Sequence, residues 1–190
     1  MMTLPLDAEK NLINRAQTGD ATAFEELIAA YTQPLYAVVR RLAQDDQEAE
    51  ATLQETFWRA WRVLERYKTD KPFLPYLVTI AANYQRDKWR KEKRNFDLDW
   101  LSYEMEDAAP SLQQQAETKQ MVADLGEILK NLPLPYRMVI SLRYDANLSY
   151  DQIAEALQLP LNTVRTHLRR AKEFIRTQMG EHAWTTWNET

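Results

Sequence analysis

The chain has 190 residues, a net charge of −4, no cysteine and three glycines, and 45% of its residues are hydrophobic. The absence of cysteine excludes disulfides and thiolate metal sites, and the two histidines, His167 and His182, lie too far from other ligand types to indicate a metal centre. Because there is no signal-peptide pattern and no run near the roughly 18 apolar residues of a membrane span, we expect a cytoplasmic protein without membrane insertion.

Charge is segregated along the chain. Residues 86–94 carry six basic and two acidic side chains, whereas residues 45–55 and residues 97–107 each hold five acids and no base. The negative net charge alone argues against a protein that binds nucleic acid, since DNA-binding domains often have a pI above about 9. The segregation nevertheless favours more than one kind of partner.

The first hundred residues show helical periodicity. Apolar residues recur at helical spacing from Phe24 to Leu42, and Pro34 predicts a break between two helices there. Asp45 and Glu48 form a capping-box pattern for a third helix. Its core face is predicted to carry Ala49, Leu53, Phe57, Ala60, Trp61 and Leu64.

A fourth helix is predicted from about Phe73 to Lys93, after a polar loop that contains proline. Its apolar stripe would hold Tyr76, Leu77, Ile80 and Tyr84. The opposite face would hold Ala82, Gln85, Arg86, Trp89 and Lys93. Trp89 could stack on unpaired bases between these cations, or it could pack against the end of its own domain while the cations are simply solvated.

The third helix has a second face, formed by Gln47, Glu50, Gln54 and Trp58. Acids here would repel DNA but could meet a basic protein surface around an aromatic anchor. The alternative is that they only keep the surface hydrated.

Beyond residue 95 the periodicity fades, and an acidic, flexible linker is predicted. A second helical cluster opens at about Lys119 and continues from Tyr136 to Tyr144 after two prolines. Ser149 and Gln152 then fit a capping box, and Asn162 is a candidate N-cap for a final helix. This pair of helices has the pattern of a helix-turn-helix.

The final helix is predicted to present a polar, basic face away from its core. Its members are Asn162, Thr163, Arg165, Thr166, Arg169 and Arg170. Side chains in the first turns of such a helix can reach base edges, and arginine offers a bidentate fork to guanine. A solvated cationic helix end is the alternative.

Three segments together resemble one family, the bacterial sigma-70 factors of the extracytoplasmic-function (ECF) group. AEATLQETFWRAW (49–61) resembles the family's polymerase-binding helix, and FLPYLVTIAANYQRDKWRKEKR (73–94) is similar to its strand-opening, minus-ten segment. The stretch from Leu132 to Arg176 resembles its minus-thirty-five reader.

The resemblance implies site residues and partners. Core RNA polymerase would bind Asp46, Glu50, Gln54, Glu55 and Trp58. The melted minus-ten strand would contact Tyr76, Asn83, Arg86, Lys88, Trp89 and Arg90, with a flipped base captured near residues 67–72. The helix-turn-helix face would read the minus-thirty-five duplex. An anti-sigma protein is a further implied partner, and no cofactor is expected.

The resulting prediction is an all-α, non-enzymatic protein with two small helical domains. The boundaries are residues 1–95 for the region-2-like domain, 96–118 for the acidic linker, 119–178 for the region-4-like domain and 179–190 for an unassigned tail. A helix-turn-helix regulator with a ligand-sensing domain would need a sensing pocket or sheet that the pattern does not offer. An enzyme would need a catalytic constellation, and none is evident.

Overall fold

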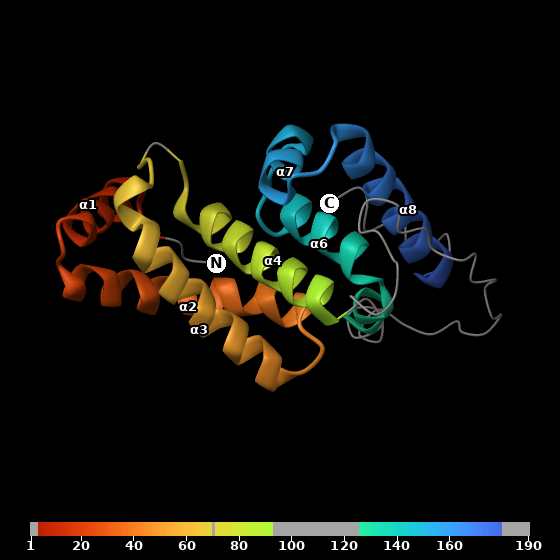
Figure 1. Cartoon of the computed structure of the whole chain (residues 1–190), viewed down its shortest axis with the longest axis horizontal. Coiled ribbons are helices and arrows are strands. Elements are labelled where there is room, and N and C mark those ends of the chain that lie inside the picture. Colours follow the sequence, from red (N-terminus) through yellow and green to blue (C-terminus); the bar gives the residue numbers. More distant parts are fainter. Residues whose placement is uncertain (1–3, 70, 93–125, 180–190) are drawn as a thin grey trace.

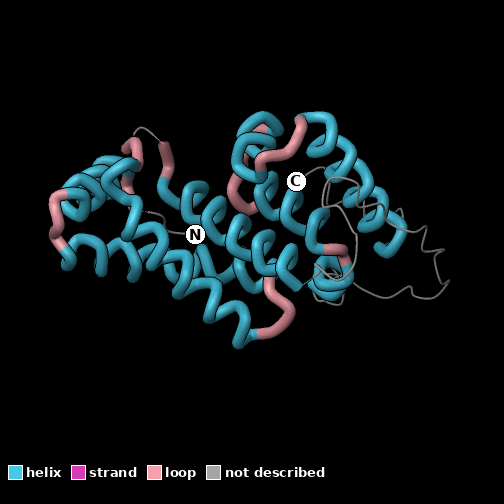
Figure 2. Tube along the Cα trace, in the orientation of Figure 1, coloured by secondary structure: helices cyan, strands magenta, loops and turns pink. Residues whose placement is uncertain are grey.

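The computed structural model describes residues 4–69, 71–92 and 126–179. These residues form helices joined by short loops, and no strand occurs within these three ranges (Figure 2). The all-α prediction is thus confirmed for the described chain. The predicted linker, residues 96–118, lies outside the described residues, as does the tail from residue 180 onward.

The N-terminal half consists of α1 (Leu6–Gln17), α2 (Ala21–Leu42), α3 (Asp46–Val63), the short 3-10 helix η1 (Leu64–Arg66) and α4 (Phe73–Glu92). Gly19, with φ of 93°, makes the tight turn between α1 and α2, where a residue with a side chain would be strained. Asp20 and Asp45 cap α2 and α3 by accepting hydrogen bonds from backbone amides.

The structure differs from the sequence-based expectation at two places in this half. α1 was not anticipated, although Leu12, Ile13 and Ala16 bury one side of it. The expected break at Pro34 is absent, because α2 runs through it. Proline removes one helical hydrogen bond. Tyr31, Leu35 and Val38 on both sides of it pack into the same core, and this burial keeps the helix continuous.

The C-terminal half contains a helical segment described from 126 to 131, then α6 (Leu134–Tyr144), α7 (Tyr150–Leu157) and α8 (Leu161–Met179). The capping box of α7 is confirmed, since Ser149 and Gln152 exchange both hydrogen bonds. α8 begins at Leu161, so Asn162 lies in its first turn and is not the N-cap. Gln158 adopts the left-handed conformation, with φ of 53°.

The two halves pack against each other, with α2 and α4 both contacting α6 and α4 also contacting α7 (Figure 1). This packing corrects the predicted faces of α4. Ala82, Gln85 and Arg86, expected to face outward, are buried. The helical wheel showed only one apolar stripe, whereas α4 is covered on two sides.

Candidate nucleic-acid and protein-binding surfaces

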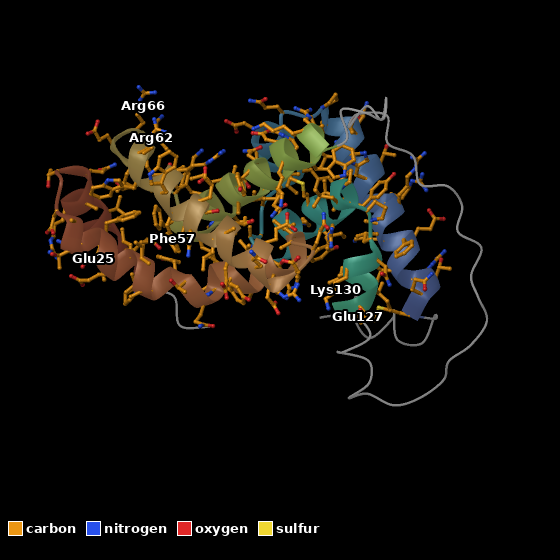
Figure 3. The ribbon with its side chains drawn as sticks, turned by 60° about the horizontal axis from the view of Figure 1, so that its bottom comes forward. Glu25, Phe57, Arg62, Arg66, Glu127 and Lys130 are labelled. Carbon is orange, nitrogen blue, oxygen red and sulfur yellow. The ribbon has the colours of Figure 1, made fainter. Side chains whose placement is uncertain are left out.

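The outer face of α3 is open to solvent. Asp46, Glu50, Gln54 and Trp58 are exposed, and Glu55 is half-buried in an ion pair with Arg59. The Trp58 ring is 52% exposed, and the Arg62 guanidinium lies 4.6 Å from its centroid. In Figure 3, Arg62 at the end of α3 and Arg66 in η1 project on the side of the molecule that lies away from Glu127 and Lys130. α3 therefore presents acid at its start, an aromatic centre and cations at its end.

Two predicted core residues of α3 are not fully buried, since Leu53 is only partly buried against the core and Trp61 is exposed. Ala49, Phe57, Ala60 and Leu64 are buried as expected, but Trp61 is 38% exposed. Its ring packs on Phe24 with centroids 4.8 Å apart. Trp61 therefore extends the aromatic surface that Trp58 begins.

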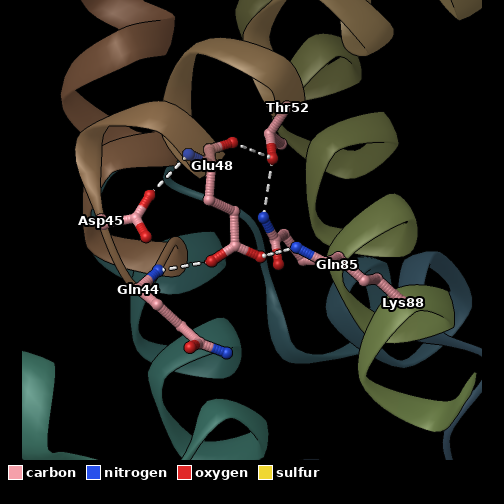
Figure 4. Close-up of polar contacts among 6 residues, drawn as sticks. All are labelled: Gln44, Asp45, Glu48, Thr52, Gln85 and Lys88. Carbon is pink, nitrogen blue, oxygen red and sulfur yellow. Dashed lines mark hydrogen bonds and ion pairs between the residues drawn. The ribbon is translucent and has the colours of Figure 1, made fainter. Parts of the chain in front are cut away.

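Glu48 joins α3 to α4 at the start of this face (Figure 4). Asp45 Oδ1 accepts a hydrogen bond from the Glu48 amide at 2.7 Å, and Glu48 Oε2 accepts one from the Gln44 amide at 2.7 Å. In a capping box the Glu48 carboxylate would accept from the amide of the N-cap residue, Asp45. Here it accepts from the amide of Gln44, one residue earlier in the chain. Glu48 Oε1 accepts from Lys88 Nζ at 2.6 Å.

Burial raises the pKa of Glu48, but the hydrogen bonds from Lys88 and the Gln44 amide outweigh it and leave the pKa below its ordinary value. Beside it, Gln85 Nε2 donates to Thr52 Oγ1 at 2.7 Å, and the Thr52 hydroxyl donates to the Glu48 carbonyl at 2.8 Å. This polar network fixes the register of α3 against α4.

The outer side of α3 and α4 forms a basic hollow of about 440 Å³. It is lined by Arg59, Tyr84, Asp87, Lys88, Arg90 and Lys91. The Arg59 guanidinium stacks 4.9 Å from the Tyr84 centroid. With four cations and one acid, the hollow suits a phosphate-bearing strand.

The predicted minus-ten residues are not all gathered in this hollow. Lys88 and Arg90 line it, whereas Arg86 is buried on another side of α4. Trp89 is half-buried against the core, which favours packing over free stacking on bases. Asn83 Oδ1 is buried and has no hydrogen-bond partner among the residues that the structure describes.

Tyr76 belongs to an aromatic cluster at the start of α4. Its ring centroid lies 4.5 Å from that of Tyr67 and 5.8 Å from that of Phe73. Glu9 of α1 accepts a hydrogen bond from the Phe73 amide at 3.3 Å, so α1 helps to hold the first turn of α4. Burial raises the pKa of the Tyr76 hydroxyl.

The α8 face is arranged as predicted. Asn162, Arg165 and Arg169 are exposed, and Thr163, Thr166 and Arg170 are partly exposed. The opposite side of α8 is buried and includes Val164 and Leu168. α8 packs against α7, in which Ile153 and Leu157 are buried. Arg169 pairs with Glu173 at 3.0 Å on the surface, a contact that DNA phosphate could replace.

His167 lies under this face and not on it. Its ring packs edge-on against Tyr136 with centroids 4.9 Å apart. Burial, together with the charge of Arg170, lowers its pKa to about 4. His167 is therefore a neutral packing residue at physiological pH.

Arg59 and Lys91 line the basic hollow, although neither was predicted as a site residue. Arg59 follows the aromatic pair Phe57 and Trp58 in the sequence, and this basic residue among aromatics was the available signal. Among the described residues, no group of three or more potential ligands could hold a metal ion. None of the described helices is both long and apolar enough to cross a bilayer.

Two sequence families match this chain. Residues 27–95 match the Sigma-70 region 2 family, and residues 123–175 match the family described as Sigma-70, region 4. The chain is 32% identical over 186 residues to the ECF RNA polymerase sigma factor SigW of Bacillus subtilis, covering 90% of this chain and 96% of that protein. It is 30% identical over 173 residues to the ECF RNA polymerase sigma-E factor of Escherichia coli K12, covering 86% of this chain and 90% of that protein.

Two solved structures have a similar fold. CnrH, in complex with the cytosolic domain of CnrY, superposes with a TM-score of 0.58 at 24% identity, covering 88% of this chain and 94% of CnrH. RpoE from Bartonella quintana, in complex with the anti-sigma factor NepR, superposes with a TM-score of 0.60 at 21% identity, covering 82% of this chain and 96% of that one. At these identities the likeness shows the fold alone.

Proposed function

Because the chain belongs to the ECF group of sigma-70 factors, which direct RNA polymerase to promoters, we propose that its two helical domains divide promoter recognition between them. The region 2 domain binds core polymerase and holds the melted minus-ten strand. The region 4 domain reads the minus-thirty-five duplex. One observation carries this division: an acidic α3 face, a basic α3–α4 hollow and an exposed α8 face occur in one chain.

The polymerase surface is centred on Trp58 of α3. The exposed ring is flanked by acids upstream and by Arg62 downstream, so a partner would bury an aromatic anchor within a charged rim. Asp46, Glu50, Gln54 and Glu55 supply the acidic and polar part of that rim. A basic helix or coiled coil of the polymerase fits this surface by charge.

Strand holding uses the basic hollow and the aromatic cluster. Unstacking bases costs a few kcal/mol per step. Stacking on an aromatic ring returns about 1–3 kcal/mol per base. Lys88 and Arg90 in the hollow and Tyr76 in the cluster are the proposed strand contacts, together with Arg59 and Lys91 of the hollow. Asn83, Arg86 and Trp89 are proposed contacts only once they are accessible, because here they pack into the protein.

Upstream recognition uses the first turns of α8. Asn162, Arg165 and Arg169 are exposed and can reach base edges or phosphates, whereas Thr163, Thr166 and Arg170 flank them. The packing of α7 against α8, in which Leu157 and Val164 are buried, holds the angle between the two helices before DNA binds.

The protein itself makes and breaks no bond, since sigma factors are non-catalytic subunits of RNA polymerase. We expect it to act in the bacterial cytoplasm, where polymerase and chromosome lie. The CnrH and RpoE structures are complexes with CnrY and with the anti-sigma factor NepR. An anti-sigma protein is therefore a proposed partner for this chain as well.

Promoter-directed transcription tests the proposal. Purified protein is added to core RNA polymerase on a library of genomic fragments, and transcript starts are mapped. Starts that need both components, with a common upstream sequence, are the expected result. Specific DNA binding by the protein alone, with no starts in the presence of core polymerase, would instead support a conventional helix-turn-helix regulator.

A further inference from the structure

α1 is connected by side-chain hydrogen bonds to the segment that joins α3 to α4. It packs against α2 and η1, at the end of the molecule away from α6 and α7 (Figure 1). The region 2 family matches residues 27–95, so α1 lies outside the matched stretch. Two polar side chains of α1, Glu9 and Gln17, nevertheless reach the backbone on both sides of the loop that precedes α4.

Gln17 holds the chain where it enters this loop. Its Nε2 donates to the Leu64 carbonyl at 2.9 Å and to the Tyr67 carbonyl at 2.8 Å. A side-chain amide nitrogen carries two N–H groups, so one glutamine can serve both carbonyls. Leu64 begins η1 and Tyr67 follows its last residue. Because a single 3-10 turn has poor hydrogen-bond geometry of its own, Gln17 fixes the position at which the chain leaves η1.

Glu9 holds the chain where it leaves the loop. Its side chain is buried, Oε1 accepts from the Phe73 amide at 3.3 Å, and Oε2 accepts from the Tyr31 hydroxyl. Phe73 is the first residue of α4, and the first amides of a helix have no partner within it. A carboxylate is also favoured by the dipole at a helix N-terminus. Glu9 therefore caps α4 from a different helix.

The two donors that the structure shows for this buried carboxylate are both neutral. Burial of a carboxylate without a cation costs free energy. Burial, together with the hydrogen bond to Glu9, raises the pKa of the Tyr31 hydroxyl, so Tyr31 remains a protonated donor. The contact with the start of α4 is thus kept at a cost in stability, which is typical of functional sites.

The aromatic cluster of Tyr67, Phe73 and Tyr76 lies between these two attachments. The rings of Tyr67 and Phe73 meet edge to face with centroids 5.4 Å apart, and Tyr31 packs edge-on against Phe73 at 5.5 Å. Phe73 is buried, whereas Tyr67 and Tyr76 are half-buried. Gln17 binds the backbone of Tyr67, and Glu9 binds the backbone of Phe73, one turn before Tyr76. α1 therefore sets the positions of all three rings.

We propose that Glu9 and Gln17 are positioning residues for the unpaired strand, and that they hold this cluster in the arrangement that receives an unstacked base of the minus-ten element. The inference rests on the proposed function, in which Tyr76 contacts that strand. Glu9 is buried and Gln17 is bonded to η1, so both act through the cluster and not by touching DNA. A cluster that is ordered beforehand binds a base more tightly, because no ordering entropy is lost on binding.

A cycle of protein variants against strand variants tests this proposal. The full-length protein is assembled with core polymerase, and its affinity is measured for a forked DNA whose minus-ten region is single-stranded. Each base of that single strand is removed in turn by an abasic substitution. With wild-type protein, loss of the captured base should weaken binding about 5- to 150-fold, the range for one base stacked on an aromatic ring.

Three variants probe the two attachments. Gln17→Leu removes both donors, and Glu9→Leu removes both acceptors. Each should reduce the abasic penalty at least about threefold, because less stacking free energy is left to lose. Glu9→Gln is the rescue, since its amide oxygen still accepts from Phe73 and its amide nitrogen can donate to Tyr31. It should keep the penalty within about twofold of wild type.

Arg15→Leu is the matched control. Arg15 is in the last turn of α1, as Gln17 is, but its side chain is 46% exposed and pairs with Asp20 at 2.7 Å. This variant should leave the abasic penalty unchanged. A purely structural role for Glu9 and Gln17 would weaken binding to intact and abasic strands by the same factor, so the ratio between them would not move.

An abasic penalty that stays at the wild-type value in Gln17→Leu and in Glu9→Leu would overturn the positioning role and leave the proposed function intact. Gln17→Leu decides the question alone if Glu9→Leu does not fold, because Gln17 is only half-buried. A wild-type holoenzyme that is insensitive to every abasic position would instead refute strand holding by the region 2 domain, and the positioning role with it.

Discussion

The Glu48 side chain connects the start of α3 to α4. Its carboxylate accepts from the Gln44 amide and from Lys88, and its side chain is 9% exposed. A buried charge is tolerated only when its hydrogen bonds are satisfied. Glu48 therefore fixes the start of α3, which carries the proposed polymerase surface, relative to Lys88 of the proposed strand surface.

Replacing this carboxylate should destabilise the protein in a pH-dependent way. Glu48→Gln keeps an acceptor but loses the charged bond to Lys88, so we expect a loss of about 1–3 kcal/mol at pH 7. The folded pKa lies below the ordinary 4.5, so this stability is present above that pH and is lost as pH falls through the folded pKa. Chemical denaturation across pH measures it.

Glu50→Gln is the control for this experiment, because Glu50 is exposed on the same helix. It should change the free energy of unfolding by less than about 0.5 kcal/mol. A Glu48→Gln deficit that stays constant down to pH 3 would show that the charge of Glu48 is not what stabilises the junction.

Recognition of the upstream DNA sequence by α8 is also expected to depend on individual side chains. Arg165→Ala and Arg169→Ala should each weaken holoenzyme binding to the upstream element by about 1–3 kcal/mol if they contact bases. Competition between matched and altered upstream sequences separates base contacts from phosphate contacts. Arg176→Ala, exposed further along α8, is the control and should not alter sequence preference. Unchanged preference in both test variants would exclude this face.

At the element scale, the turn of the helix-turn-helix stores strain. Gln158 holds φ of 53° and ψ of 45°, and this conformation costs a non-glycine residue on the order of 1–2 kcal/mol. Gln158→Gly should therefore raise the free energy of unfolding by up to about 1 kcal/mol. Thermal denaturation checks this. Gln158→Ala should give no gain, and equal gains in both variants would contradict the strain.

At the same scale, reversing the charge of the outer face of α3 should weaken the binding of this helix to core polymerase. Glu50→Lys is expected to reduce association with core polymerase about tenfold or more, because it places a cation where the proposed partner is basic. Glu25→Lys, an equal change on the exposed side of α2, should leave association intact. Fluorescence anisotropy with labelled protein measures both, and normal assembly of Glu50→Lys would remove α3 from the interface.

Local patterns predicted most of the helices and their caps, since Asp45, Ser149 and Gln152 act through neighbours in the chain. Pro34 misled the prediction, because its local penalty is outweighed by core packing on both sides of it. α1 was missed because four buried positions among many polar ones make a weak signal. The exposed faces of α3 and α8 followed from periodicity, as expected for helices covered on one side.

At the scale of the whole molecule, contacts between helices far apart in the sequence could not be predicted from the sequence. The pattern of α4 predicted an exposed Arg86, yet a carbonyl more than seventy residues away in sequence holds it. Packing between domains leaves no periodic signature in either partner.

Permanganate and nuclease footprinting of one promoter tests the central claim, the division of labour between the domains, most directly. With core polymerase present, we expect an upstream protected duplex and, further downstream, thymines made reactive by melting. Glu50→Lys should abolish both signals, whereas Arg165→Ala should weaken the upstream protection first. Melting by the protein alone, or a holoenzyme footprint confined to one element, would contradict the account.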